Sequence, residues 1–258
     1  MNFKQLLLCI LVFASTIKQA GAQKSKSIDF MSQIGKYDLS AIVTADSIID
    51  EDREDNKEKI KRRDPLGFIG DNYQRFYIHI TAMVKSQDKP AEYYVYGKTR
   101  VKNNICDFIG TMIVTSCTLN PEVEIPGYKQ GIATFEVKLY EDAKNSGAGL
   151  ITGKLETHFL IDKQGKFRYD AIMLVADGFS NNQFAGIWTS YQTKTVKKCN
   201  WGDYRIPNSK ELDSGAGEFM VNEKYVKNGW ENYREMMSSV DTQGVKKART
   251  EEERKWWK

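Results

Sequence analysis

Alternating apolar and polar positions run through the middle of the chain, most clearly from Tyr73 to Val84. One side of this segment carries Gln74, Phe76, Ile78, Ile80, Ala82 and Val84, and the other carries Tyr73, Arg75, Tyr77, His79 and Thr81. A period of two over this length is typical of a half-buried antiparallel strand. We therefore predict one long strand here, beginning after the turn signal at Pro65 and Gly67.

Comparable segments follow at short intervals, separated by turn signals. They span Tyr93–Lys102, Ile105–Leu119, Gly131–Tyr140, Leu150–Asp162, Lys166–Ala176, Phe184–Lys194 and Lys197–Ile206. About eight strands joined by short turns are typical of an antiparallel meander, which closes into a barrel or folds into a sandwich. Interior glycines mark bulges and tight bends, and they occur here at Gly97, Gly110, Gly153 and Gly186. The predicted fold class is mainly β, as a barrel or strongly curved sheet.

The segments before the strands have mixed patterns. Ser27 and Gly35 bracket a short predicted helix, because Ser is a favoured helix start and Gly a favoured stop. The segment Tyr37–Ile49 fits a helix and a strand equally well. The stretch Glu51–Asp64 is charged almost throughout, which predicts a solvated loop more than a helix.

The segment after the strands changes to helical spacing. Apolar residues recur every three or four positions from residue 217 to 239, which predicts one helix, or two broken at Asn228-Gly229. In the tail, Thr250 and Glu253 have capping-box spacing. The predicted organisation is therefore an N-terminal appendage (23–66), a barrel-like domain (67–207) and a C-terminal helical segment (208–258).

Residues 1–22 have the layout of a secretory signal peptide. A basic start precedes the apolar run LLLCILVFA, and the stretch ends in Ala20-Gly21-Ala22. We expect cleavage after Ala22 and a periplasmic, extracellular or cell-surface location. Cys9 lies inside the apolar run, where it is badly placed for lipid attachment. No later stretch approaches the ~20 apolar residues of a transmembrane helix.

Charge and cysteine content narrow the function further. Removal of residues 1–22 takes away Lys4 and Lys18, so the formal charge falls from +4 to +2, which does not favour nucleic acid as a partner.

If Ile105–Leu119 is one strand, Cys106 and Cys117 lie about 36 Å apart, beyond the ~7 Å limit of a disulfide. Two alternatives stay open. Either Cys106 or Cys117 forms a disulfide with Cys199, or all three cysteines are unpaired core residues.

Recognisable catalytic motifs are not present. The stretch SGAGLITGKL lacks the leading glycine and the Ser or Thr of a phosphate-binding loop, and the histidines, His79 and His158, make a zinc site improbable. Strand carboxylates at Glu136, Glu156 and Asp170 leave a hydrolase open as an alternative. We expect no catalytic set, no metal and no cofactor.

The aromatic residues are the most suggestive feature of the strands. Aromatic rings with a polar edge suit stacking on sugars or lining an apolar cavity, although they also fill barrel cores. The predicted ligand-binding residues are Tyr77, Tyr94, Tyr96, Trp188, Tyr191 and His158, with Trp201 and Tyr204 as further strand aromatics. A small apolar molecule or a glycan is the predicted ligand.

A recurrent Gly-x-large-apolar pattern carries a resemblance to a known architecture. It occurs at Gly186–Trp188, Gly110–Met112 and Gly153–Leu155, and it resembles the strands of calycin-type barrels, the lipocalins and avidins. Lipocalins carry Gly-x-Trp on the first strand, whereas here it falls on about the seventh, so no ligand site is transferred. The chain as a whole resembles β-rich secreted proteins of Gram-negative gut anaerobes, which implies a location and not an activity.

These observations favour a secreted, non-enzymatic binding protein. One alternative is an interaction component of a cell-envelope assembly, with the charged stretch Glu51–Arg63 or the aromatic tail as the contact. The other alternative is a hydrolase that uses strand carboxylates, with His158 as a partner.

Overall fold

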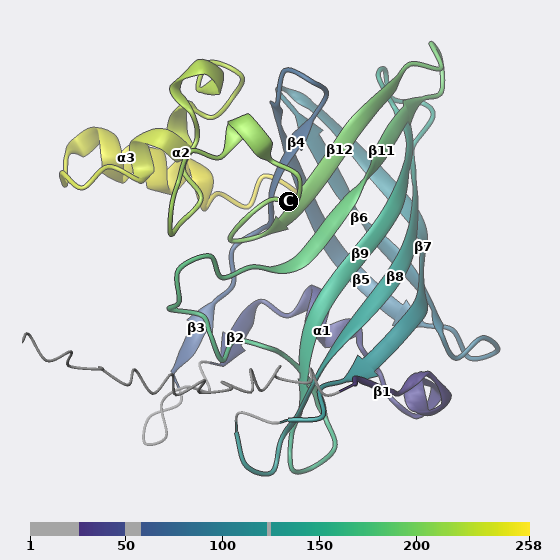
Figure 1. Cartoon of the computed structure of the whole chain (residues 1–258). Helices are drawn as coiled ribbons and strands as arrows, with labels where there is room; N and C mark the ends of the chain where they lie inside the picture. Colours follow the sequence, from purple (N-terminus) through teal and green to yellow (C-terminus); the bar gives the residue numbers. More distant parts are fainter. Residues whose placement is uncertain (1–25, 50–57, 123–124) are drawn as a thin grey trace, which may run out of the picture.

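Eight antiparallel strands close into a barrel in the computed structural model, which describes residues 26–49, 58–122 and 125–258 (Figure 1). The wall consists of β4 (Leu66–Ile69), β5 (Gln74–Lys85), β6 (Glu92–Val101), β7 (Asn104–Leu119), β8 (Lys129–Glu141), β9 (Gly149–Ile161), β11 (Asn181–Ser190) and β12 (Val196–Asp203). Each wall strand pairs with the next, and β12 returns to β4 with Trp201 opposite Gly67. The predicted mainly β class is confirmed, and of the two predicted forms, a barrel or a strongly curved sheet, the structure has the closed barrel.

The set of wall strands differs from the predicted one at two places. Only β10 (Phe167–Tyr169) forms in the predicted strand Lys166–Ala176, and it pairs with β9 alone. The apolar residues that follow belong to a loop, in which Ala171 and Ile172 are buried while Val175 is exposed. The wall strand that was not predicted is β4. It is only four residues long and therefore too short to show an alternating pattern.

Glycines allow aromatic side chains to lie flat against the inner wall. A Cβ atom at Gly153 or Gly186 would lie within 2.6 Å of the Phe184 ring, and one at Gly97 would lie 2.5 Å from Phe108. These distances are shorter than any side chain tolerates. The Phe184 ring therefore needs Gly186 on its own strand and Gly153 on the neighbouring β9, and the Phe108 ring needs Gly97 on the neighbouring β6. At these positions the interior glycines therefore make room for aromatic rings, and their predicted role in curving the wall stays a prediction.

A β-bulge interrupts the alternation of β5. The register shifts between Ile80 and Ala82, and one extra residue reverses the face of every later side chain. Ile78 is buried inside the barrel as its side of the pattern requires, but beyond the bulge Met83 is buried and Val84 is 62% exposed. The predicted single face from Gln74 to Val84 is therefore wrong in its last part.

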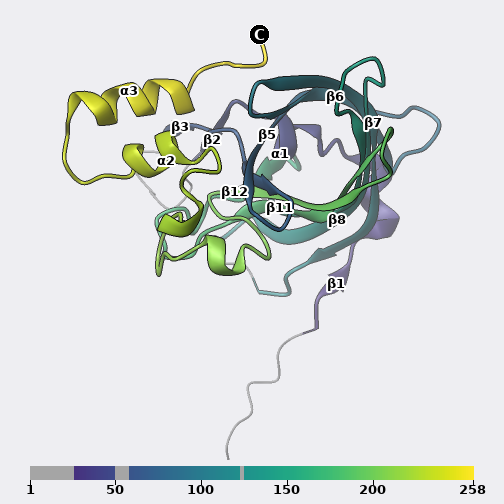
Figure 2. The same ribbon diagram turned by 90° about the horizontal axis from the view of Figure 1, so that it is seen from above.

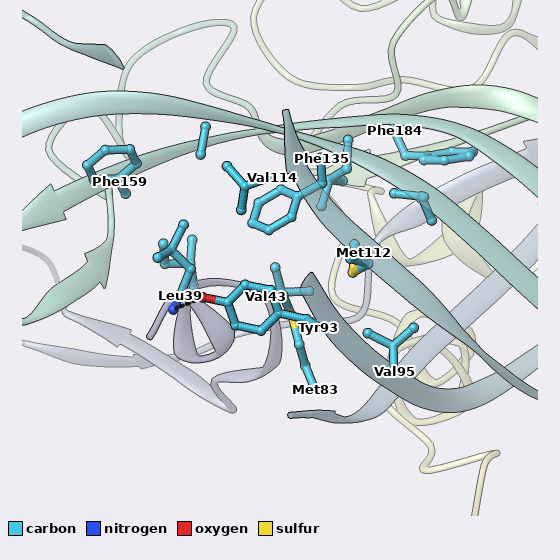
Figure 3. Close-up of a cluster of buried hydrophobic side chains, with 14 of the residues drawn as sticks. Leu39, Val43, Met83, Tyr93, Val95, Met112, Val114, Phe135, Phe159 and Phe184 are labelled. Atoms are coloured by element: carbon cyan, nitrogen blue, oxygen red, sulfur yellow. Dashed lines mark hydrogen bonds between the residues drawn. The ribbon is translucent and has the colours of Figure 1, made fainter. Parts of the chain in front are cut away.

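The N-terminal segment closes one end of the barrel. β1 (Ile28–Asp29) pairs with β7, the 3-10 helix η1 spans Met31–Lys36, and α1 spans Ser40–Thr44. The Leu39 backbone N–H donates to the Tyr93 hydroxyl at 3.1 Å (Figure 3), and Leu39, Ile42 and Val43 are buried. Burial raises the pKa of Tyr93 to about 12. The predicted helix after Ser27 begins later and is a 3-10 helix.

The segment Tyr37–Ile49, which fitted a helix and a strand equally well, contains one of each. After α1 the chain enters β2 (Ser47–Ile49), which pairs with β3 (Lys59–Lys61). Beyond β3, Arg62 forms a buried ion pair with Asp203 at 3.1 Å and donates to the Val43 carbonyl. This contact joins the closing segment to the end of β12. Half of the predicted charged loop, residues 51–57, lies outside the described residues, and the other half contains the strand β3 where a loop was predicted.

The C-terminal segment packs on the outside of the barrel, beside β4 and β12 (Figures 1 and 2). It contains η2 (Lys210–Leu212), η3 (Glu223–Tyr225), α2 (Glu231–Met236) and α3 (Gln243–Glu252). Its own apolar cluster includes Phe68 of β4 together with Leu212, Phe219, Trp230 and Tyr233. This cluster is separate from the core inside the barrel.

Two helix predictions for the C-terminal segment need correction. Of the two alternatives predicted before residue 239, the break at Asn228-Gly229 is confirmed, since Gly229 has a positive φ of 90° that ends helical geometry. The two parts are shorter than predicted, because they are only the 3-10 turn η3 and the six residues of α2. The cap of α3 is Thr242, whose hydroxyl accepts from the Val245 N–H at 3.1 Å. Thr250 lies inside this helix and donates to the Lys246 carbonyl.

The cysteines outside the predicted signal peptide are all buried and free. Cys106 and Cys117 lie on the same continuous strand, β7, so they cannot pair with each other, as predicted for an unbroken strand. Cys199 lies on β12 and is also unpaired. The alternative of three core thiols is the one observed.

Candidate functional site

The end of the barrel opposite the N-terminal segment is open. The turns between β4 and β5, β6 and β7, β8 and β9, and β11 and β12 all lie at this end. They surround a cavity of about 380 Å³, here named the barrel-mouth pocket. Its apolar side is formed by Ile69, Phe76, Val101 and Trp188. Mouths of β-barrels are common ligand sites, and the volume falls in the range of such sites.

A buried carboxyl group forms the polar side of the barrel-mouth pocket. Glu141 is only 6% exposed. Its Oε2 accepts from the Trp188 indole N–H and from the Gly149 backbone N–H, both at 2.8 Å, while its Oε1 accepts from the Thr99 hydroxyl. Burial raises the pKa of Glu141 because the lost hydration outweighs the three donors. Among the described residues Oε1 has one donor, so it can accept another hydrogen bond.

The local sequence explains why this carboxyl points inward. β8 alternates, with Ala133, Phe135, Val137 and Leu139 inside the barrel, and Glu141 continues the same side. Its partner Trp188 needs Gly149, because a Cβ there would lie 2.6 Å from the indole nitrogen. The Lys197 ammonium lies 5.6 Å from the centre of the Trp188 ring, within the range of a cation–π contact.

The thiol in this pocket is not an activated nucleophile. Cys106 lines the barrel-mouth pocket, and its buried position, with Glu141 nearby, raises its pKa to about 11. A thiol with a raised pKa is protonated at neutral pH and reacts slowly. Cys106 is therefore a wall residue of the pocket and not a candidate nucleophile.

One of the predicted ligand-binding residues, Trp188, lines the barrel-mouth pocket, and a second, Tyr191, lies near the same turn but not in the lining. Tyr191 follows at the end of β11, half-buried, with its N–H donating to the Ala148 carbonyl at 3.1 Å. Burial raises the pKa of Tyr191, and the nearby Glu141 carboxylate contributes to this shift. Of these residues, sequence reasoning missed Glu141, although it continues the inward series of β8.

The other predicted ligand-binding residues lie elsewhere on the molecule. Tyr94 and Tyr96 point out of the barrel and are 52% and 41% exposed. His158 is on the outer face of β9, where its Nε2 lies 3.8 Å from an oxygen of Glu156. Tyr77 is also on the outer face, beneath the C-terminal tail, with its ring 6.0 Å from that of Trp256. The predicted residues therefore do not form one site.

The predicted candidates for acid–base chemistry are likewise dispersed. His79 bonds to Asp64 at 2.8 Å and stacks on Trp257 at 3.8 Å between ring centres. Asp170 accepts from Gln130 and from a backbone N–H, which is a structural role, and Glu136 is exposed on the outer wall. Among the described residues no three His, Cys, Asp or Glu side chains cluster as metal ligands would. In the same residues no helix has the length and apolar character needed to cross a membrane.

The comparisons with known proteins add no identity to this geometry. No family model, curated protein or solved structure matches the chain. A closed, eight-stranded antiparallel barrel is compatible with a calycin-like architecture, which is as far as the resemblance extends.

Proposed function

We propose that this chain is a secreted, non-enzymatic binding protein that holds a small amphipathic molecule in the barrel-mouth pocket. The carrying observation is a buried carboxyl group, Glu141, in the wall of an open cavity that is also lined by the apolar side chains Ile69, Phe76, Val101 and Trp188, with polar residues such as Asn72, Lys102 and Lys197 completing the lining. Burying an ionisable group costs free energy unless hydrogen bonds compensate it. A buried ionisable side chain that has this free-energy cost and lines an open cavity is a candidate functional residue.

The contacts of Glu141 define the ligand. Because Oε1 accepts only from Thr99 in the described part of the chain, a ligand hydroxyl or ammonium group can supply the next donor. The Trp188 and Phe76 rings and the Ile69 side chain then contact the apolar part. The ligand is therefore a small molecule with one hydrogen-bond-donating end and an apolar body.

Calorimetric titration of residues 23–258 tests this function. The panel contains short alkyl alcohols and amines, and the methyl ethers of the alcohols, which keep the apolar body but cannot donate. Donor ligands should bind at least tenfold more tightly than the ethers, and Glu141→Gln should remove this preference. The matched control is Glu136→Gln, the same change at an exposed position of the same strand. Equal binding of alcohols and ethers contradicts the proposal.

The outer wall supports glycan binding as a second candidate function. Tyr96, Ile109 and Tyr140 lie directly opposite one another on β6, β7 and β8, and they are 41%, 66% and 45% exposed. Exposed tyrosine rings in a row suit stacking on sugars, and the Tyr96 hydroxyl is held by Asp107 at 2.9 Å. Polysaccharide pull-down that is unchanged in Tyr96→Ala with Tyr140→Ala removes this candidate.

A further inference from the structure

A second cavity lies between the barrel and the C-terminal segment. It has a volume of about 590 Å³ and is here named the flank groove. Its walls come from β5, from the end of β12, from the loop before Phe179 and from the C-terminal residues beyond Gly217. Figures 1 and 2 show α2 and α3 on this side of the barrel. The flank groove is on the outside of the wall and is therefore distinct from the barrel-mouth pocket.

The walls of the flank groove are largely apolar and adaptable. They include Leu66, Leu174, Phe179, Phe219, Met236 and Met237. Methionine side chains are flexible and polarisable, and they accommodate ligands of varied shape. A cavity of this size and lining is typical of sites for small apolar molecules.

The buried charges of the flank groove already neutralise one another. Arg75 and Glu252 form an ion pair at 3.2 Å, with side chains 4% and 8% exposed. Asp203 is paired with Arg62. A charged ligand group buried here would find no free partner among these residues, and burial of an unpaired charge is costly. The buried part of a ligand must therefore be uncharged.

Arg75 nevertheless has hydrogen-bonding capacity left. Its Nε and Nη1 atoms are buried without an acceptor in the part of the chain that the structure describes, and its guanidinium lies 4.1 Å from the centre of a Trp230 ring. Since Glu252 balances the charge, the group that suits these donors is a neutral carbonyl or ether oxygen.

The rim of the flank groove disfavours acids. Asp177 and Glu218 are exposed at the rim, and in the described residues neither has an ion-pair partner. Among the described residues of the rim, Lys61 is the base without an ion pair, so the unpaired acids outnumber it. A carboxylate approaching this opening is repelled, whereas a neutral ester is not.

We propose that the flank groove binds an uncharged, lipid-like ester whose oxygen atoms face Arg75. An ester accepts hydrogen bonds but donates none, so it does not meet the requirement of Glu141 in the barrel-mouth pocket. The proposed ligand class thus separates the two cavities chemically as well as spatially.

Calorimetric titration of residues 23–258 with methyl octanoate and with octanoate tests this proposal. The ester should bind at least tenfold more tightly than the acid at neutral pH. Ala176→Phe, which fills the groove from the loop side, should weaken ester binding at least tenfold. Met237→Trp fills it from the C-terminal segment and should weaken ester binding to the same extent, which keeps the test valid if the first variant fails to fold. Val84→Ser on the exposed outer wall is the control for non-specific adsorption and should bind the ester normally.

Three results would overturn the proposal. One is equal or tighter binding of octanoate, because the argument from paired charges and rim acids then fails. Another is unchanged ester binding in both filling variants. The third is a loss of binding in Val84→Ser, which assigns the signal to the outer wall.

Discussion

The pH dependence of stability should report the buried carboxyl of Glu141. The perturbation is Glu141→Gln, which replaces the titrating group with a neutral one of the same shape. The glutamine oxygen can accept from the Trp188 and Gly149 N–H groups, and its amide can donate to the Thr99 hydroxyl. The variant therefore keeps three hydrogen bonds, and it differs from wild type only in that the side chain at position 141 no longer titrates.

The direction in which stability changes with pH follows from the direction of the pKa shift of Glu141. In the unfolded chain Glu141 titrates near pH ~4.3, and burial raises its pKa in the folded protein. Between these two values the folded state binds more protons than the unfolded state. The stabilising contribution is thus fully present below the unfolded pKa and is lost as the pH rises through the folded pKa. The loss amounts to about 1.4 kcal/mol for each unit by which the pKa is raised.

Urea unfolding of wild type and variant between pH 4 and pH 8 measures this contribution. The free energy of unfolding of wild type minus that of Glu141→Gln should fall with pH, with a slope no steeper than about −1.4 kcal/mol per pH unit, and then level off. Glu136→Gln, at an exposed position on the same strand, should show no comparable slope. A difference that rises with pH would refute the reasoning, because the three donors would then outweigh burial.

The remaining predictions concern stability and are checked by the same unfolding assay. Gly153→Ala should cost about 1–3 kcal/mol, because its Cβ would lie 2.4 Å from a backbone oxygen and 2.6 Å from an aromatic ring; an unchanged midpoint contradicts the close packing of the inner wall. Glu252→Ala should cost about 3–5 kcal/mol because it leaves Arg75 buried and unpaired, whereas Glu251→Ala, at an exposed neighbour, should stay within about 0.5 kcal/mol. Thr242→Ala removes the cap of α3 and should cost about 1 kcal/mol; no loss means that α3 does not depend on it.

Only part of the candidate site could be predicted from the sequence. Trp188 was predicted as a binding residue and does line the barrel-mouth pocket, because large aromatic residues on a strand are visible without knowledge of the fold. Glu141 was not predicted, since a glutamate at the end of a strand looks solvent-exposed until the turn after it is placed. Tyr94 and Tyr96 share a face with each other, but the pattern does not say that this face is the outer one.

The amino-acid sequence by itself determined the wall of the barrel wherever strands were long. A period of two over β8 and β9 separates two faces, because successive side chains of a strand point to opposite sides. The interior glycines predicted a curved wall. The tertiary structure alone decided closure, since β4 is too short to show a period and acts only by pairing with β12. It also decided the bulge in β5, the loop that replaces the strand predicted after Lys166, and both cavities, because each depends on contacts between residues far apart in the chain.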